Sequence, residues 1–213
     1  MSASPRTADG ARPPDAAAFS ALLSGLTDGL AGESITFGAI LERLHDRAFG
    51  ILALLLALPN ALPGPAIPGF SLLFGLPLAV LGLQMAAGRP TPWLPPFLAR
   101  RAIARTRLET LLAHAVPRVR PVERLFRPRY PWLAGERRLG LVLTLLALVM
   151  SLPVPLGNLP VALSIIIIAL GLIAGDGLAV LAGILAGVAA ALWNAFLLFA
   201  GAHLVHWLVG RLF

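Results

Sequence analysis

Cysteine and lysine are both absent from this chain of 213 residues, and only ten residues are acidic. Without cysteine there is no disulfide framework, and the redox compartment cannot be read from the sequence. The basic residues are all arginine, a residue suited to anion recognition. A GC-rich genome produces the same richness in arginine and alanine, so the absence of lysine alone does not indicate an anion-binding site. Charged residues make up 13% of the chain, whereas a soluble domain of this size carries about 25%. This composition disfavours an ordinary soluble domain.

Apolar residues dominate instead: 58% of the chain is hydrophobic, and the mean hydropathy is +0.84. Many of the 19 prolines and 21 glycines interrupt apolar stretches. Broken apolar helices are tolerated in a membrane only where protein or water satisfies the freed backbone groups. The N-terminal residues do not have the pattern of a secretory signal. We therefore expect an all-α integral membrane protein that inserts through its internal apolar segments.

The apolar and polar stretches suggest a division into three parts. Residues 1–14 are expected to form a disordered arm, residues 15–48 amphipathic helices, and residues 49–213 a membrane domain. Ser34 or Thr36 is the expected cap of the second amphipathic helix. The membrane domain should contain a first broken hairpin at 49–87, an arginine-rich segment at 88–138, a second broken hairpin at 139–175 and a C-terminal transmembrane helix at 176–213.

Each hairpin is interrupted by a proline-rich stretch that a regular helix cannot cross. The Pro-x-Pro motifs of the two stretches lie roughly 90 residues apart, and Leu81-Gly82-Leu83 and Leu170-Gly171-Leu172 follow at a similar offset, which predicts an internal repeat. Interrupted apolar segments in corresponding halves indicate a transporter-type site near the bilayer midplane. The alternative is that the prolines only turn the chain. The candidate site residues are Asn60, Pro63, Pro65, Pro68, Pro153, Pro155, Asn158 and Pro160.

The segment 88–138 contains twelve arginines and only three glutamates. The positive-inside rule places it and the N-terminus in the cytoplasm and the C-terminus in the periplasm. Within it, residues 97–115 have the pattern of an amphipathic helix lying on an anionic leaflet. Gln84 and Asp176 are expected at the membrane boundary, Asp176 as a helix N-cap, with a functional role at membrane depth as the alternative. The candidates for contact with anionic lipid or phosphate are Arg89, Arg100, Arg101, Arg127 and Arg129.

No pattern of catalytic residues stands out. The chain has no Asp-x-Asp pair of the kind that holds a metal–nucleotide complex, and no phosphate-binding loop follows a strand pattern. His203 and His206 share one side of a helix, but no acidic residue or cysteine lies nearby in the sequence. We predict no catalytic residue, metal or cofactor. The expected partners are membrane lipids with anionic head groups and a lipid-linked saccharide; a homodimer stays open, and no nucleic acid is expected.

Several motifs, in order and spacing, resemble the ExoD family of exopolysaccharide synthesis proteins over roughly residues 19–211. They are the segment Leu41–Gly50, Leu58-Pro59-Asn60, the break Pro63–Gly69, Gln84 followed by Gly88-Arg89, Pro92–Pro95, Arg127-Pro128-Arg129, Leu152–Pro160 and Asp176-Gly177-Leu178.

The resemblance implies a multi-pass protein of the bacterial inner membrane that is associated with exopolysaccharide production, and it implies no particular reaction. The first hypothesis is a transporter-like or accessory component that handles a polar or lipid-linked substrate at the two proline-rich breaks. The second is a membrane enzyme that acts on phosphorylated lipid-linked sugars and holds the phosphate with arginines. The third is a membrane scaffold that recruits cytoplasmic partners through 88–138.

Overall fold

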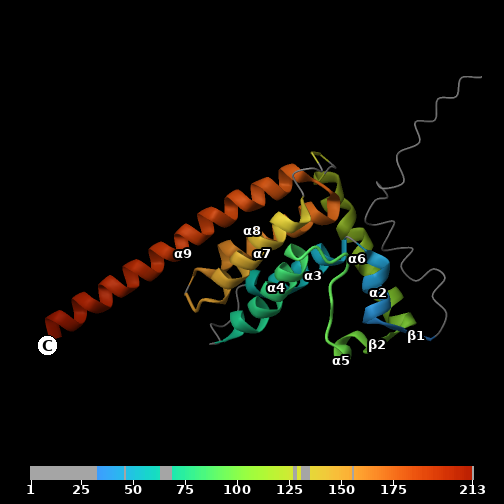
Figure 1. The fold of residues 1–213 in the computed structure, drawn as a ribbon, viewed down its shortest axis with the longest axis horizontal. Coiled ribbons are helices and arrows are strands. Elements are labelled where there is room, and N and C mark those ends of the chain that lie inside the picture. Colours follow the sequence, from blue (N-terminus) through green and yellow to red (C-terminus); the bar gives the residue numbers. More distant parts are fainter. Residues whose placement is uncertain are drawn as a thin grey trace, which may run out of the picture.

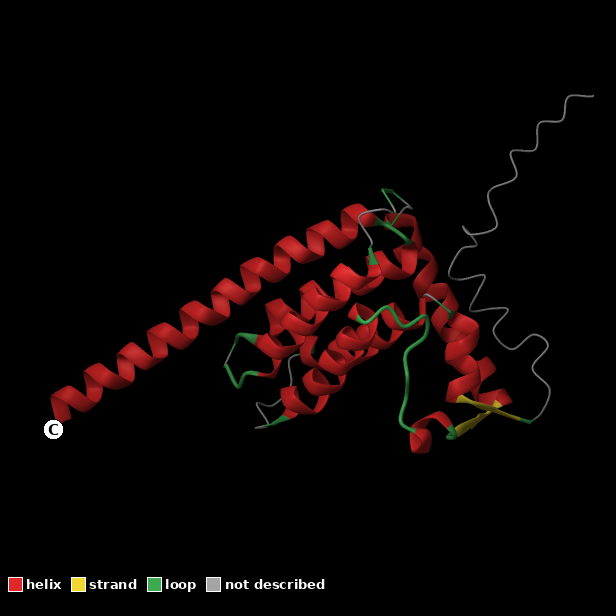
Figure 2. Cartoon of the chain, viewed as in Figure 1, coloured by secondary structure: helices red, strands yellow, loops and turns green. Residues whose placement is uncertain are grey.

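The computed structural model describes residues 33–45, 47–62, 69–126, 129–130, 135–154 and 156–212, and helices make up most of them (Figures 1 and 2). The expected arm at 1–14 therefore lies outside the described residues. The elements are β1 (Ser34–Thr36), α2 (Phe37–Leu44), α3 (Arg47–Ala61), α4 (Phe70–Ala86), α5 (Pro96–Ala99), β2 (Ala102–Ala104), α6 (Arg105–Leu125), α7 (Glu136–Ser151), α8 (Asn158–Ala174) and α9 (Gly177–Leu212).

The four helices of the two expected hairpins form a bundle together with the first half of α9. In this bundle α3 packs on α4 and α8, α7 packs on α4 and α8, and α9 packs mainly on α8. The core includes Phe49 from α3, Leu78 from α4, Leu143 from α7 and Ile165 from α8, each 2% exposed or less. The close van der Waals contacts among these apolar side chains stabilise the bundle.

Glycine lets α4 and α7 approach until their backbones touch. The Cα of Gly75 lies next to Ser151, and that of Gly82 next to Thr144 and Gly140, so the two helices run antiparallel. On the other side of the bundle, Gly50 of α3 lies against Ala169 and Ile173 of α8. Small residues at such crossings are typical of helices that associate in membranes, where close van der Waals packing replaces the hydrophobic effect.

The helix breaks are shorter than the proline pattern predicts. α3 continues through Pro59 to Ala61, and only two residues of the helix follow this proline, so little helix is lost by the interruption. α8 already begins at Asn158 and contains Pro160 in its first turn, where a helix needs no N–H donor. The start of α4 lies beside the end of α7, because these two helices run antiparallel. The connection before α4 and the turn after α7 are therefore at the same end of the bundle (Figure 1).

A small unit at the opposite end of the bundle contains β1, α2, α5, β2 and α6 (Figure 1). β1 and β2 pair antiparallel, with Ile35 opposite Ile103. The sequence analysis found no strand, and the expected helix at 97–115 is wrong in its first part, because α5 ends at Ala99 and β2 precedes α6. The expected cap is confirmed at Thr36, whose Oγ1 accepts a hydrogen bond from Ala39 N at 3.3 Å.

The apolar side of α6 is covered in part by the protein. Leu108 is buried, and Leu112 packs against the cluster formed by Leu41, Leu44 and Ala48. Leu111 is 55% exposed. The interpretation of this segment as a helix lying on a leaflet therefore stays a prediction, with less apolar surface available to lipid than the sequence pattern indicates.

α9 is the one described helix that is long and apolar enough to cross a membrane. It has 36 residues, or about 54 Å, and its C-terminal half extends past the bundle (Figure 1). α3, α4 and α8 are apolar but have 15 or 17 residues, about 23–26 Å. The C-terminal helix of the sequence analysis is confirmed as a helix, whereas the multi-pass arrangement stays a prediction.

The internal repeat also stays a prediction. The pairing of α3 with α8 and of α4 with α7 is what a two-fold relation between the hairpins requires. The matching tripeptides, however, have different surroundings: Gly82 lies against α7, while Gly171 lies against Val180 of α9. The glycine motif therefore does not mark equivalent positions of the two hairpins, and the structure does not show the repeat.

Candidate functional site

Polar side chains gather at the end of the bundle where the two hairpins turn. Asn158, the first residue of α8, donates a hydrogen bond from Nδ2 to Oγ of Ser71 in the first turn of α4. Both residues are half-buried. Two residues that are 87 positions apart in the sequence thus join the two hairpins at their turning ends. We refer to Asn60, Ser71, Asn158 and Asn194 as the turn-end polar cluster.

Asn60 lies near the end of α3 and is 8% exposed. α3 ends at the turn end of the bundle and α8 begins there, so the two helices run antiparallel. The contact of Gly50 with Ala169 and Ile173 then sets the level of Asn60 along α8. Ten residues of helix, about 15 Å, separate Gly50 from Asn60, and the same distance back along α8 ends about one turn from Asn158. Asn60 and Asn158 therefore lie at similar depth in the bundle.

Asn194 completes the cluster and was missed in the sequence analysis. It lies in the middle of α9, is 1% exposed, and donates from Nδ2 to the carbonyl oxygens of Gly157 at 2.9 Å and Ala190 at 3.0 Å. A Cβ at Gly157 would overlap Asn194 Oδ1, so the glycine permits this contact. The available signal was a lone amide within an otherwise apolar run, because polar side chains in such helices usually bond to a neighbouring helix.

Three atoms of the cluster are buried without a hydrogen-bond partner: Asn60 Nδ2, Asn158 Oδ1 and Asn194 Oδ1. A buried polar group without a partner costs about 1–3 kcal/mol. The sequence has no ionisable residue from Ala48 to Gly88, from Leu139 to Gly175 or from Gly177 to Ala202, so this end of the bundle is uncharged. The cluster can thus exchange neutral hydrogen bonds with a bound group, as donor and as acceptor.

The structure describes two of the six prolines predicted for the site. Pro153 is exposed in the turn between α7 and α8, and Pro160 is half-buried in the first turn of α8. Pro63, Pro65, Pro68 and Pro155 lie outside the described residues. Among the described turn residues, Leu156 is 83% exposed and has a φ of 62°, a left-handed conformation that is rare for a branched side chain.

Four of the five predicted anion-contacting arginines lie among the described residues. Arg89, Arg100 and Arg101 are exposed at the end of the bundle opposite the cluster, and Arg127 lies outside the described residues. The exposed Arg129 contributes its backbone, whose carbonyl accepts a hydrogen bond from Gly177 N at 2.7 Å at the start of α9. The guanidinium of Arg137, not predicted, lies against Gly88. An anionic lipid surface at this end stays a prediction.

The two predicted boundary residues have structural contacts. Gln84 binds the backbone of Trp93 with both amide atoms: Oε1 accepts from Trp93 N at 2.6 Å, and Nε2 donates to Trp93 O at 3.3 Å. Asp176 is 4% exposed and caps α9, because its Oδ1 accepts from the N–H groups of Leu178 and Ala179. These contacts match the expected N-cap and give neither residue a free polar atom for a ligand.

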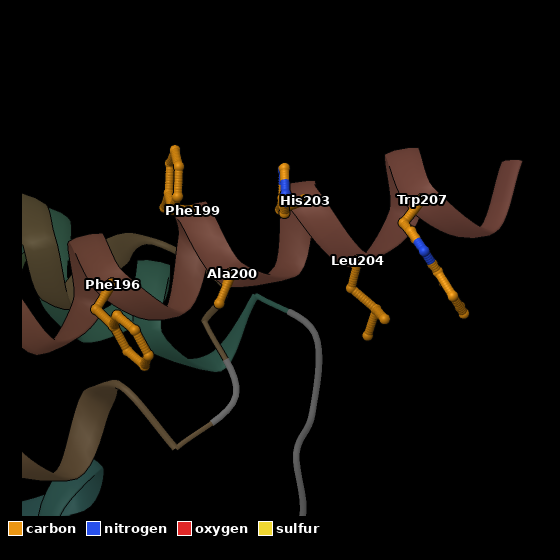
Figure 3. A pocket seen from close by; sticks show the side chains of 6 residues that line it. All are labelled: Phe196, Phe199, Ala200, His203, Leu204 and Trp207. Atoms are coloured by element: carbon orange, nitrogen blue, oxygen red, sulfur yellow. The ribbon is translucent and has the colours of Figure 1, made fainter. Parts of the chain in front are cut away.

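The far half of α9 has an apolar hollow of about 400 Å³, lined by Phe196, Phe199, Ala200, His203, Leu204 and Trp207. Phe199 and His203 stack on one side of the helix, and Phe196, Leu204 and Trp207 point to the other (Figure 3). Arg211 lies over the Trp207 ring at 4.6 Å, a cation–π contact. The hollow offers apolar contact alone, as a surface in contact with lipid does. In the described part of the chain, no three His, Asp or Glu side chains are grouped to hold a metal.

The fold is thus a helical bundle with one long apolar helix and an uncharged polar cluster at one end, which indicates a membrane protein. The chain belongs to the ExoD family, described as exopolysaccharide synthesis, whose model matches residues 19–196. The resemblance seen in the sequence is confirmed.

Two curated relatives are similar to parts of the chain. An uncharacterised protein of Synechocystis sp. is 32% identical over 112 residues, which are 53% of this chain and 52% of the relative. Protein ExoD of Rhizobium meliloti is 32% identical over 111 residues, 52% of this chain and 45% of the relative. The chain therefore matches about half the length of each. No solved structure matches it.

Proposed function

We propose that this protein is an inner-membrane component of exopolysaccharide production, and that it holds a polar or lipid-linked substrate at the turn-end polar cluster. The family and the similarity to Protein ExoD of Rhizobium meliloti support the process. One observation carries the site: three amide atoms of asparagines are buried without partners at the end where the hairpins turn. A bundle of otherwise apolar helices retains such groups at a cost in stability, which a bound polar group would offset.

The cluster favours a transporter-like or accessory role over an enzyme. Amide and hydroxyl groups bind and orient a polar group, whereas hydrolysis or transfer of a phosphorylated sugar requires a base, a nucleophile or a metal. The described arginines that would hold a phosphate, Arg89, Arg100, Arg101 and Arg129, lie at the opposite end of the bundle. A scaffold remains the second candidate, because Arg100, Arg101 and Arg107 are exposed on the unit around α6.

The function is tested by replacing Asn60 or Asn158 with Leu, a side chain of similar size without hydrogen-bonding groups. In a strain that lacks this protein and carries each variant, we expect exopolysaccharide production to fall about tenfold or more, since losing one or two hydrogen bonds to a substrate costs about 1.5 kcal/mol or more. The amount of protein in the membrane should stay near that of the wild type. Production is measured as secreted hexose, and protein by immunoblot.

Ser151→Ala is the matched control for this experiment. Ser151 lies at the same end of the bundle, but its hydroxyl already bonds to Ala147 O within α7 at 2.8 Å. We expect normal production from this variant. Normal production from both asparagine variants, or a parallel loss of production and protein, would show that the cluster only supports the fold and would favour the scaffold.

The proposed membrane orientation is tested by reporter fusions. α6 and the C-terminal end of α9 lie at opposite ends of the molecule (Figure 1), and the arginines gather at the end that holds α6. Arginine-rich segments stay on the cytoplasmic side. A phosphatase reporter, active only in the periplasm, should be inactive when inserted at Glu109 and active when fused after Phe213. Activity at Glu109 would refute both the cytoplasmic position of 88–138 and the contact of its arginines with the inner leaflet.

A further inference from the structure

We propose that the turn-end polar cluster binds a neutral, hydroxyl-bearing group, a sugar residue, and does not bind a phosphate or another ion. This inference rests on the proposed function and specifies its substrate class. It follows from three properties of the cluster: the kind of atoms left without partners, the absence of charge around them, and the cancellation of the helix dipoles that end there.

The orientation of Asn194 is fixed by its neighbours. Its Nδ2 bonds to two carbonyl oxygens, which can only accept, so the unpartnered atom must be the acceptor Oδ1. The nearby Cα of Gly157 offers this oxygen a weak C–H contact at most. The cluster therefore requires a donor from outside.

Asn60 has the opposite requirement. Its Nδ2 is unpartnered and needs an acceptor. Asn158 bonds to Ser71 through one amide atom, and its other amide atom has no partner. Because the Ser71 hydroxyl can donate or accept a hydrogen bond, the Asn158–Ser71 pair can bind either a donor or an acceptor of the ligand. A sugar residue meets both needs, because it carries several hydroxyl groups and each of them donates one hydrogen bond and accepts others. Asn158 and Ser71, both half-buried, provide access from the turn end.

An ion fits this place poorly. No ionisable side chain occurs in the apolar segments that surround it, so a phosphate or a cation would be desolvated without a counter-charge. α4 and α8 begin at this end and α3 and α7 end there, so two positive and two negative helix ends meet and their fields largely cancel. The site therefore discriminates by hydrogen bonds and not by charge.

The test uses the full chain, purified in a polyoxyethylene ether detergent that has no sugar head group. Thermal unfolding is followed by tryptophan fluorescence, to which Trp193, the neighbour of Asn194, contributes. The probes are methyl β-glucoside and methyl β-galactoside as neutral sugars and monomethyl phosphate as the anion. We expect at least one glycoside to raise Tm saturably, by about 2–4 °C at roughly five times its dissociation constant. Monomethyl phosphate should give no shift.

Asn60→Leu and Ser151→Ala are the paired variants. In Asn60→Leu the glycoside shift should vanish, while Tm without ligand should not fall, because the change removes a buried donor that has no partner. Ser151→Ala should keep the shift. A shift retained in Asn60→Leu would overturn the proposed position of the sugar. If Asn60→Leu does not fold, the wild-type comparison of glycoside with phosphate still decides the ligand class.

The outcomes separate this inference from the proposed function. No glycoside shift, or a shift with monomethyl phosphate, overturns the sugar. If production still depends on Asn60 and Asn158, the proposed function then stands with another ligand. Normal production from both leucine variants overturns the proposed function even where the glycosides bind.

Discussion

Replacing Gly140 with alanine should separate α7 from α4 and unfold the bundle at a much lower temperature. A Cβ at this position would overlap the backbone nitrogen of Ala86 and lie 2.6 Å from the carbonyl oxygen of Gly82. These are backbone atoms of a neighbouring helix, which cannot rotate away as a side chain can. We expect a loss of about 3 kcal/mol or more, and a fall in Tm of roughly 6–12 °C in detergent.

Gly201→Ala is the control for Gly140→Ala. Gly201 also lies in a helix, but a Cβ there would meet no atom within 4 Å. Alanine stabilises a helix by roughly 0.5–1 kcal/mol relative to glycine, so this variant should keep or slightly raise Tm. If Gly140→Ala behaves like Gly201→Ala, the close contact of α4 with α7 does not exist in the folded protein.

Replacing Asn194 with leucine should cost nearly as much as replacing Gly140. The substitution removes both hydrogen bonds of Nδ2 and leaves the buried carbonyl of Gly157 without this partner. It also places methyl groups where the Cα of Gly157 leaves room only for an amide oxygen. We expect a loss of about 2–4 kcal/mol, measured as a fall in Tm of roughly 4–16 °C without ligand.

The neighbouring position 192 provides the comparison. Leu192 is 67% exposed on the same helix, so Leu192→Ala should change Tm by no more than about 1–2 °C. An Asn194→Leu variant with the stability of Leu192→Ala would show that the link between α9 and the turn before α8 contributes nothing to the fold. The contrast with Asn60→Leu is also informative, since that change removes an unpartnered donor and should not destabilise the protein.

The sequence was informative where a single local preference decides the structure. The helices of both hairpins, the turns at the proline-rich stretches, and the caps at Thr36 and Asp176 follow from apolar length, missing N–H donors and side chains that accept N–H bonds. Element ends were less well predicted. α3 passes Pro59 because a proline within the last turn interrupts little of the helix.

What depends on contacts between distant segments was not predictable. β2 has three residues and exists because it pairs with β1, some 70 positions earlier in the sequence. Asn194 joins the site only because α9 passes the turn before α8, and no local pattern sets that contact. Of the predicted site residues, Asn60 and Asn158 do lie at one end of the bundle, while the described arginines Arg89, Arg100, Arg101 and Arg129 lie at the other.

In the multi-pass arrangement that we predict, the unequal lengths of the helices create a hydrophobic mismatch. The helices of the bundle measure about 23–26 Å, less than the roughly 30 Å of a hydrocarbon core, whereas α9 measures about 54 Å. In that arrangement we expect the bilayer to thin beside the short helices, and the long one to tilt or emerge from the lipid. Thinning at the turn end brings water and head groups toward Asn158 and Ser71. The access of a polar group to the cluster then depends on the thickness of the surrounding membrane as well as on the protein.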